Sequence, residues 1–99
     1  MFTKKQDPII LCAGSNGRAV IFGTPTKKPV PGQPVTLKNA RMVLRWAASC
    51  GGLFGLAAKG PKGDTRMTHA VAETTATQWR ETVAVSTEAA KGLESWPAA

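Results

Sequence analysis

Basic side chains recur at short spacings in the middle of this chain of 99 residues. Arg41 and Arg45 lie in the segment V-T-L-K-N-A-R-M-V-L-R-W, and Lys59 and Arg66 follow further along the chain. Guanidinium groups donate parallel hydrogen bonds to an oxyanion, and an ammonium group adds a further positive charge. Residues of these types at this spacing predict a site that contacts phosphate.

Gly51 and Gly52 stand at the start of a predicted short helix, Leu53–Lys59. A helix that opens in this way presents free backbone amides at the positive end of its dipole, which suits a phosphate group. Trp46 lies close by in the sequence and offers a ring on which a base can stack. The alternative is that these charges are ordinary solvent-facing residues on a sheet with one wet face.

The remaining chemistry-bearing residues predict neither catalysis nor metal binding. His69 is the single histidine and has no directly neighbouring Cys, Asp or Glu. The carboxylates are scattered, and no phosphate-loop, dinucleotide-binding or nucleophile-elbow motif occurs. Cys12 and Cys50 lack metal-ligand spacing, so we expect reduced thiols in a cytosolic compartment, with a disulfide as the alternative. We expect no enzyme and no cofactor.

The segment around the arginines predicts two strands joined by a tight turn at Asn39-Ala40. Apolar and polar residues alternate over Val35–Lys38 and again over Met42–Trp46, which is the period of a half-buried strand. The second strand would have one apolar face and one cationic, wet face. These faces comprise Met42, Leu44 and Trp46, and Arg41, Val43 and Arg45, respectively. Gly60 and Pro61 would end the short helix that follows.

The same patterns predict one domain over residues 1–99, with a flexible leader at residues 1–8. The other expected elements are a hairpin over residues 9–23, a proline-rich surface loop over 24–34, a fifth strand over 65–71, a threonine-rich turn over 72–77, a last strand over 78–85 and a helix from Ser86 or Thr87 to about Ser95. The expected fold class is therefore a small β-rich α+β domain. Its strands would form a twisted antiparallel sheet or a partly closed barrel with two short helices.

The composition is strongly basic, with 13 Lys and Arg against 6 Asp and Glu and a net charge of +7. This excess favours an anionic partner such as a nucleotide, a nucleic acid or an acidic surface, although a charge of this size also serves solubility. Aromatic residues are few and tyrosine is absent, so the core is thin and we expect a homo-oligomer. We expect neither a signal peptide nor a membrane span.

Four motifs, taken in order, resemble a family of small phage and prophage proteins of about this length. They are G-R-A-V-I-F-G, V-T-L-K-N-A-R-M-V-L-R-W, G-G-L-F-G-L-A-A-K-G-P and S-T-E-A-A-K-G-L-E-S-W, within residues 9–96. The most specific part is the N-A-R…W strand followed by the G-L-x-x-L-A-x-x-G-P helix. The resemblance implies a phage-encoded, compact, strand-rich domain without a recognised catalytic motif. This chain departs from the family in its longer proline-rich loop and its basic balance.

A phage protein of this kind is expected either to neutralise a host defence component or to contribute to the virion. The first hypothesis is a homo-oligomer in the host cytoplasm that sequesters a phosphate-bearing immune signalling nucleotide. The residues expected at this ligand are Arg41, Arg45, Lys59, Arg66, Gly51 and Gly52 for phosphate and Trp46 for the base. The alternatives are a virion decoration or accessory subunit and an inhibitor that docks directly on a host defence protein. Duplex nucleic acid is less expected, because no predicted helix is basic along its length.

Overall fold

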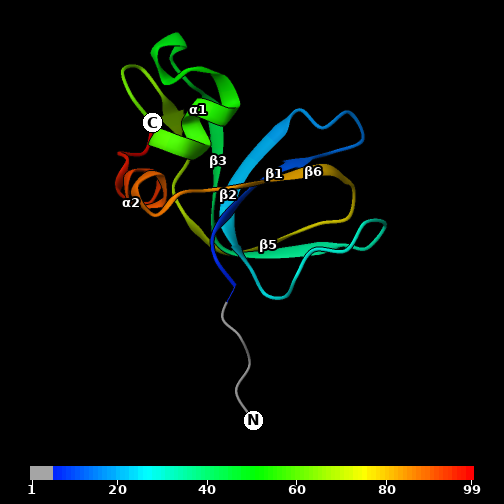
Figure 1. The fold of residues 1–99 in the computed structure, drawn as a ribbon. Helices are drawn as coiled ribbons and strands as arrows, with labels where there is room; N and C mark the ends of the chain where they lie inside the picture. Colours follow the sequence, from blue (N-terminus) through cyan, green and yellow to red (C-terminus); the bar gives the residue numbers. More distant parts are fainter. Residues whose placement is uncertain (1–5) are drawn as a thin grey trace.

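The computed structural model describes residues 6–99 as a strand-rich fold with its α-helices gathered at one side (Figure 1). The strands are β1 (Ile9–Ala13), β2 (Ala19–Pro25), β3 (Val35–Arg45), β4 (Arg66–Met67), β5 (Val71–Ala76) and β6 (Trp79–Ala84). The helices are the 3-10 helix η1 (Ala48–Cys50) and the α-helices α1 (Gly52–Lys59) and α2 (Thr87–Ser95). Of the predicted flexible leader, residues 1–5 lie outside the described residues.

The strands form one antiparallel sheet in which β4, β3, β2, β1 and β6 lie in this order. Strand β5 pairs with the first half of β3, and β4 pairs with its end, so β3 borders three other strands. Strands β1 and β2 form the predicted hairpin. The sheet is twisted and unclosed (Figure 1), and the prediction of a β-rich α+β fold with two short helices is confirmed.

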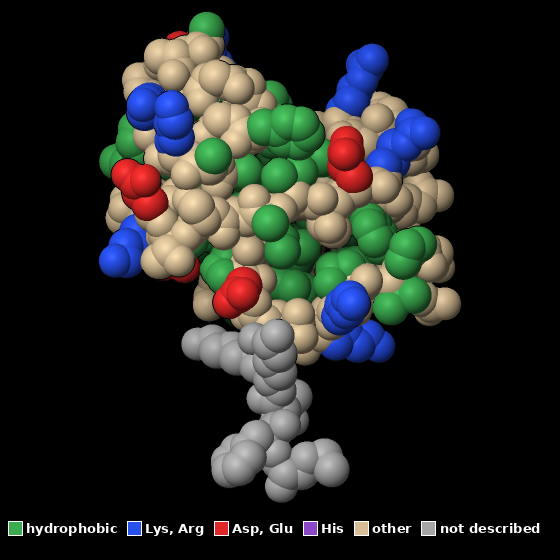
Figure 2. Space-filling view, viewed as in Figure 1, with side chains coloured by type: hydrophobic (Ala, Val, Ile, Leu, Met, Phe, Trp, Pro, Cys, Tyr) green, Lys and Arg blue, Asp and Glu red, His purple; other side chains and the backbone are tan. Residues whose placement is uncertain are grey.

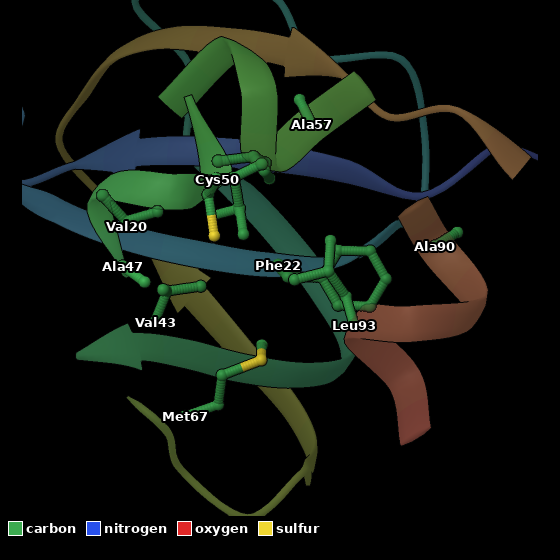
Figure 3. Packing of buried hydrophobic residues seen from close by; sticks show 11 residues of the cluster. Val20, Phe22, Val43, Ala47, Cys50, Ala57, Met67, Ala90 and Leu93 are labelled. Carbon is green, nitrogen blue, oxygen red and sulfur yellow. The ribbon is translucent and has the colours of Figure 1, made fainter. Parts of the chain in front are cut away.

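Both faces of this sheet are covered along β1, which explains why this strand is apolar along its whole length. Ile10 joins the cluster beneath α1 and α2, whereas its neighbour Leu11 joins a second cluster on the opposite face. Figure 3 shows the first cluster, in which Phe22 of β2 lies beside Leu93 of α2. Successive residues of a strand point to opposite faces, so a strand covered on both sides needs apolar side chains throughout.

The two α-helices are joined to each other through the residue that begins α2. The Oγ of Ser86 accepts a hydrogen bond from the amide of Ala89 at 3.0 Å and donates one to the carbonyl of Ala58 at 2.7 Å. The first bond is the N-cap of α2, at the first of the two predicted starting residues, and the second links this cap to α1. Gly60 follows α1 at φ +93°, and a Cβ there would lie 3.3 Å from the Cα of Ala89. Close packing of the helices therefore depends on both positions.

The predicted turn at Asn39-Ala40 is wrong, because β3 runs unbroken through it. Phe22 faces Arg41 across the ladder, whereas Thr24 faces Lys38, so β3 carries one extra residue opposite Gly23. This is a β-bulge, and Asn39 adopts φ +51° within it. A Cβ on Gly23 would lie 3.0 Å from the Cβ of Leu37. The glycine therefore allows the two strands to approach closely at the bulge.

The bulge also makes the predicted assignment of faces wrong. Arg41 and Val43, expected on the wet face, are buried, and Val43 belongs to the cluster beneath the helices. Met42 and Leu44, expected in the core, are exposed. An extra residue shifts the alternation of side chains by one position, so the residues after it exchange faces.

Two further predictions on the second half of the chain are wrong in their boundaries. The expected fifth strand over 65–71 is interrupted after the short β4, and the expected turn over 72–77 is largely strand β5, which begins at Val71. Thr36 and Thr75 face each other across β3 and β5, and their hydroxyl groups are 2.8 Å apart. The threonine-rich stretch is thus a strand, in keeping with the preference of β-branched residues for sheets.

The bulge gives a stability test at one position. Replacement of Asn39 by Val should lower the free energy of unfolding by about 1–3 kcal/mol, because a β-branched residue is strained at positive φ. Replacement by Gly, which adopts this conformation freely, should change it by less than about 0.5 kcal/mol. Urea denaturation of both variants measures the difference. Equal stability of the two would contradict the bulge.

Candidate anion-binding cleft

Arg41 is the first residue of β3 beyond the bulge, and its guanidinium group is held by backbone carbonyls. Its Nε donates to the carbonyl of Thr68 at 2.8 Å, and Nη1 donates to those of Leu93 at 2.8 Å and Glu94 at 3.3 Å. The last two carbonyls belong to the final turn of α2, where a positive charge interacts favourably with the helix dipole. Arg41 thus joins the end of α2 to the sheet.

The same side chain is a buried cation without a close counterion. Arg41 is 5% exposed, and burial lowers the pKa of its guanidinium group below the ordinary value. Within residues 6–99 the one ion pair closer than 4.0 Å joins Arg45 to Asp64 and does not involve Arg41. Removing a charge from water costs free energy unless an opposite charge compensates it. An anion that reached this group would supply the compensation.

One nitrogen of the group remains available for such an anion. Among the described residues, no hydrogen bond is made by Nη2 of Arg41. Every side-chain nitrogen or oxygen of the described residues that is fully buried makes a hydrogen bond. Because Nη2 makes none, it is not fully buried and keeps some contact with solvent. The guanidinium group is therefore fixed by two of its nitrogens and open at the third.

Arg41 lines an open cleft between the bulge and α2. The lobe at Arg41 has a volume of about 310 Å³ and is bordered by Phe22, Gly23, Thr24, Asn39, Ala70 and Glu94. A second lobe of about 650 Å³ shares Thr24, Asn39 and Glu94 with the first. Lys38 of β3 and Lys91 of α2 line this larger lobe, together with the carboxyl group of Asp7. The cleft thus offers three cationic groups and two carboxylates.

The structure divides the predicted phosphate-binding residues among separate places. Arg45 and Arg66 face each other across β3 and β4, and Arg45 also pairs with Asp64 at 2.9 Å. Lys59 ends α1 next to the start of α2, where the carbonyls of Ala57 and Ala58 meet Ser86. Arg41 lies at the opposite end of α2. These four residues therefore do not form one site.

The glycines and the tryptophan of the predicted site also lie apart from Arg41. Gly51 has φ +85° and ends η1, and its amide already donates to the carbonyl of Ala48 at 3.1 Å. Gly52 begins α1 and is exposed. Trp46 is half-buried against the cluster beneath the helices. Its ring is thus partly used in packing.

Sequence reasoning did not single out Lys91 or the cleft. Lys91 is far from β3 in the sequence, and only the packing of α2 brings it to the lobe that Lys38 lines. Figure 2 shows that, on the face it displays, basic side chains are spread around the margin of a central apolar area. No local pattern distinguishes the two lysines at the cleft from the other lysines.

The metal-ligating residue types, the thiols and the helices of residues 6–99 are expected to form neither a metal site nor a membrane span. No group of three or more His, Cys, Asp or Glu side chains lies close enough together there to hold a metal ion. Cys12 and Cys50 are free and buried, and burial, with a smaller contribution from Glu81, raises the pKa of the Cys12 thiol. None of the helices described is long and apolar enough to cross a membrane.

Comparison with known families finds a match that extends over most of the chain. The model of a domain family of unknown function, DUF6948, matches residues 6–93. The chain belongs to this family. The matched range contains every strand of the sheet and most of α2. No curated protein and no solved structure matches the DUF6948 chain.

The two arginines of β3 should differ sharply in their effect on stability. Replacing Arg41 by Met should lower the free energy of unfolding by about 2–4 kcal/mol, because the carbonyls of Thr68 and Leu93 would lose their donors. Replacing Arg45 by Met should cost less than about 0.5 kcal/mol, since its ion pair is exposed. Denaturant unfolding of the two variants compares their stabilities. Similar losses of unfolding free energy would contradict the conclusion that Arg41 is buried and joins α2 to the sheet.

Proposed function

We propose that this DUF6948 protein is a non-enzymatic binding protein that holds an anionic, nucleotide-type ligand in the cleft at Arg41. The observation that supports this most directly is the guanidinium group itself. It is 5% exposed, is fixed by three carbonyls, and has no carboxylate within 4.0 Å among the described residues. A preorganised, partly desolvated cation binds an oxyanion more strongly than a mobile surface cation does. The reason is that its side chain loses less conformational freedom on binding and less water has to be removed from it.

The lining of the cleft favours a nucleotide over a bare phosphate ion. The larger lobe, of about 650 Å³, lies in the size range of small-molecule sites. Lys38 and Lys91 would interact with further phosphate oxygens, while the Glu94 and Asp7 carboxylates would accept hydrogen bonds from amino or hydroxyl groups. Val85 and Ala90 add apolar surface for a base or sugar.

The biological setting of this proposal comes from the resemblance to phage proteins. We propose that the protein is phage-encoded and sequesters a host immune signal in the host cytoplasm, acting as a homo-oligomer. An oligomer needs an apolar contact, and Phe54 on α1 is 73% exposed. This ring is larger than any other side chain among the exposed large hydrophobic residues of the described chain.

Ligand binding can be tested by calorimetric titration at low salt with a panel of linear and cyclic nucleotides and with pyrophosphate. We expect at least one nucleotide to bind. The double variant Lys38→Ala/Lys91→Ala should weaken this binding by about tenfold, since two charge contacts are lost. A matched variant, Lys27→Ala/Lys28→Ala in the proline-rich loop, removes the same charge and should weaken it by less than about twofold.

Two results would contradict the proposed function. The first is that no member of the nucleotide panel binds at low salt. The second is that the cleft variant and the loop variant weaken binding equally, because the interaction would then follow net charge and not the cleft.

The oligomeric state can be tested separately by light scattering. We expect a defined oligomer for the unmodified protein and a monomer for Phe54→Ser, because burial of one phenylalanine side chain contributes about 2–3 kcal/mol per contact. Val30→Ser, which removes another exposed apolar side chain, serves as the control and should leave the mass unchanged. A monomeric unmodified protein would show that the homo-oligomer proposal is wrong.

A further inference from the structure

The side of β3 that holds Met42 and Leu44 becomes steadily more exposed toward the end of the strand. Ala40, Met42 and Leu44 occupy alternate positions beyond the bulge, and their exposed fractions are 3%, 39% and 56%. Ala40 belongs to the second core cluster, and Ile21, which packs against that cluster, faces Met42 across the ladder. These three residues form an apolar stripe along β3. Its first residue, Ala40, lies in the core, whereas the rest of the described chain leaves Met42 and Leu44 exposed.

A group of cations lies where this stripe ends. Arg45 follows Leu44 directly and stands opposite Arg66 on β4. Like charges at directly opposed positions destabilise a sheet. Asp64 offsets part of this repulsion through its ion pair with Arg45, and Lys62 belongs to the same turn, closed by the 3.3 Å bond from the Thr65 amide to the Lys62 carbonyl. Three cations thus accompany one carboxylate.

We infer that this β3–β4 corner, defined by Met42, Leu44, Arg45, Lys62 and Arg66, is a docking surface for an acidic protein. The partner it fits presents apolar side chains flanked by carboxylates. The carboxylates relieve the repulsion between Arg45 and Arg66, and the apolar side chains cover Met42 and Leu44. Interfaces commonly combine an apolar centre with complementary charges at the rim.

Other classes of partner match either the apolar side chains or the cations of this corner, but not both. A second copy placed around a two-fold axis would bring both Arg45–Arg66 pairs together and increase the repulsion. A nucleic acid would pair with the cations but would leave Met42 and Leu44 without an apolar counterpart, and the corner presents no exposed aromatic ring for stacking. The inference is independent of the cleft at Arg41, which lies toward the bulge and the end of α2.

The test uses labelled peptides and fluorescence anisotropy at near-physiological salt. One probe alternates leucine with glutamate, a second has serine in place of leucine, and a third probe is a single-stranded oligonucleotide. The unmodified protein should bind the leucine–glutamate peptide at least about tenfold more tightly than the serine–glutamate peptide. Leu44→Ser and the double variant Arg45→Gln/Arg66→Gln should each abolish most of this preference. NMR shifts on titration should concentrate at the corner.

A matched set of changes in the proline-rich loop provides the control. Val30 is exposed there and lies near Lys27 and Lys28, so Val30→Ser and Lys27→Gln/Lys28→Gln should leave the preference intact. Equal binding of the two peptides would overturn the inference, because attraction would then be electrostatic alone. It is also overturned by tighter binding of the oligonucleotide, or by a doubling of the mass of the unmodified protein that Leu44→Ser prevents.

Discussion

One extra residue in β3 determines which face of the sheet Arg41 reaches. The bulge at Asn39 shifts the alternation, so that Arg41 points toward the helices and Met42 and Leu44 point away from them. Without the shift, the arginine would point to the opposite face of the sheet, and the carbonyls of Leu93 and Glu94 would lose their donor. Gly23 allows the partner strand to approach the bulge closely. The cleft and the docking corner thus both depend on this local irregularity.

The buried arginine has two consequences that oppose each other energetically. Its bonds to Thr68, Leu93 and Glu94 join the sheet to α2 and stabilise the fold. Its charge, removed from water and without a carboxylate partner in the described chain, costs free energy. In the proposed function an anionic ligand reduces this cost. Ligand binding would then stabilise the folded state, and the cleft would bind anions more strongly than exposed cations elsewhere on the surface.

Much of the fold could be predicted from local patterns. The hairpin over residues 9–23 and the start of the last helix depend on neighbours in the sequence, and the structure confirms both. The bulge could not be predicted, because Asn39-Ala40 has the composition of a turn and only pairing with β2 and β5 shows that the strand continues. The candidate cleft was missed for a related reason. Its lysines, Lys38 and Lys91, come together only through tertiary packing.

The central claim is that Arg41 is a fixed guanidinium group open to an anion at one nitrogen. NMR spectroscopy of the arginine side chains measures this directly. We expect the Nε–H and Nη–H signals of Arg41 to be sharp and slowly exchanging, and its Nη signals to shift when pyrophosphate is added. The signals of Arg18 and Arg80, whose side chains are exposed, should stay averaged and unchanged. Rapid rotation of the Arg41 guanidinium group, or a pyrophosphate response seen only at Arg45 and Arg66, would contradict the account.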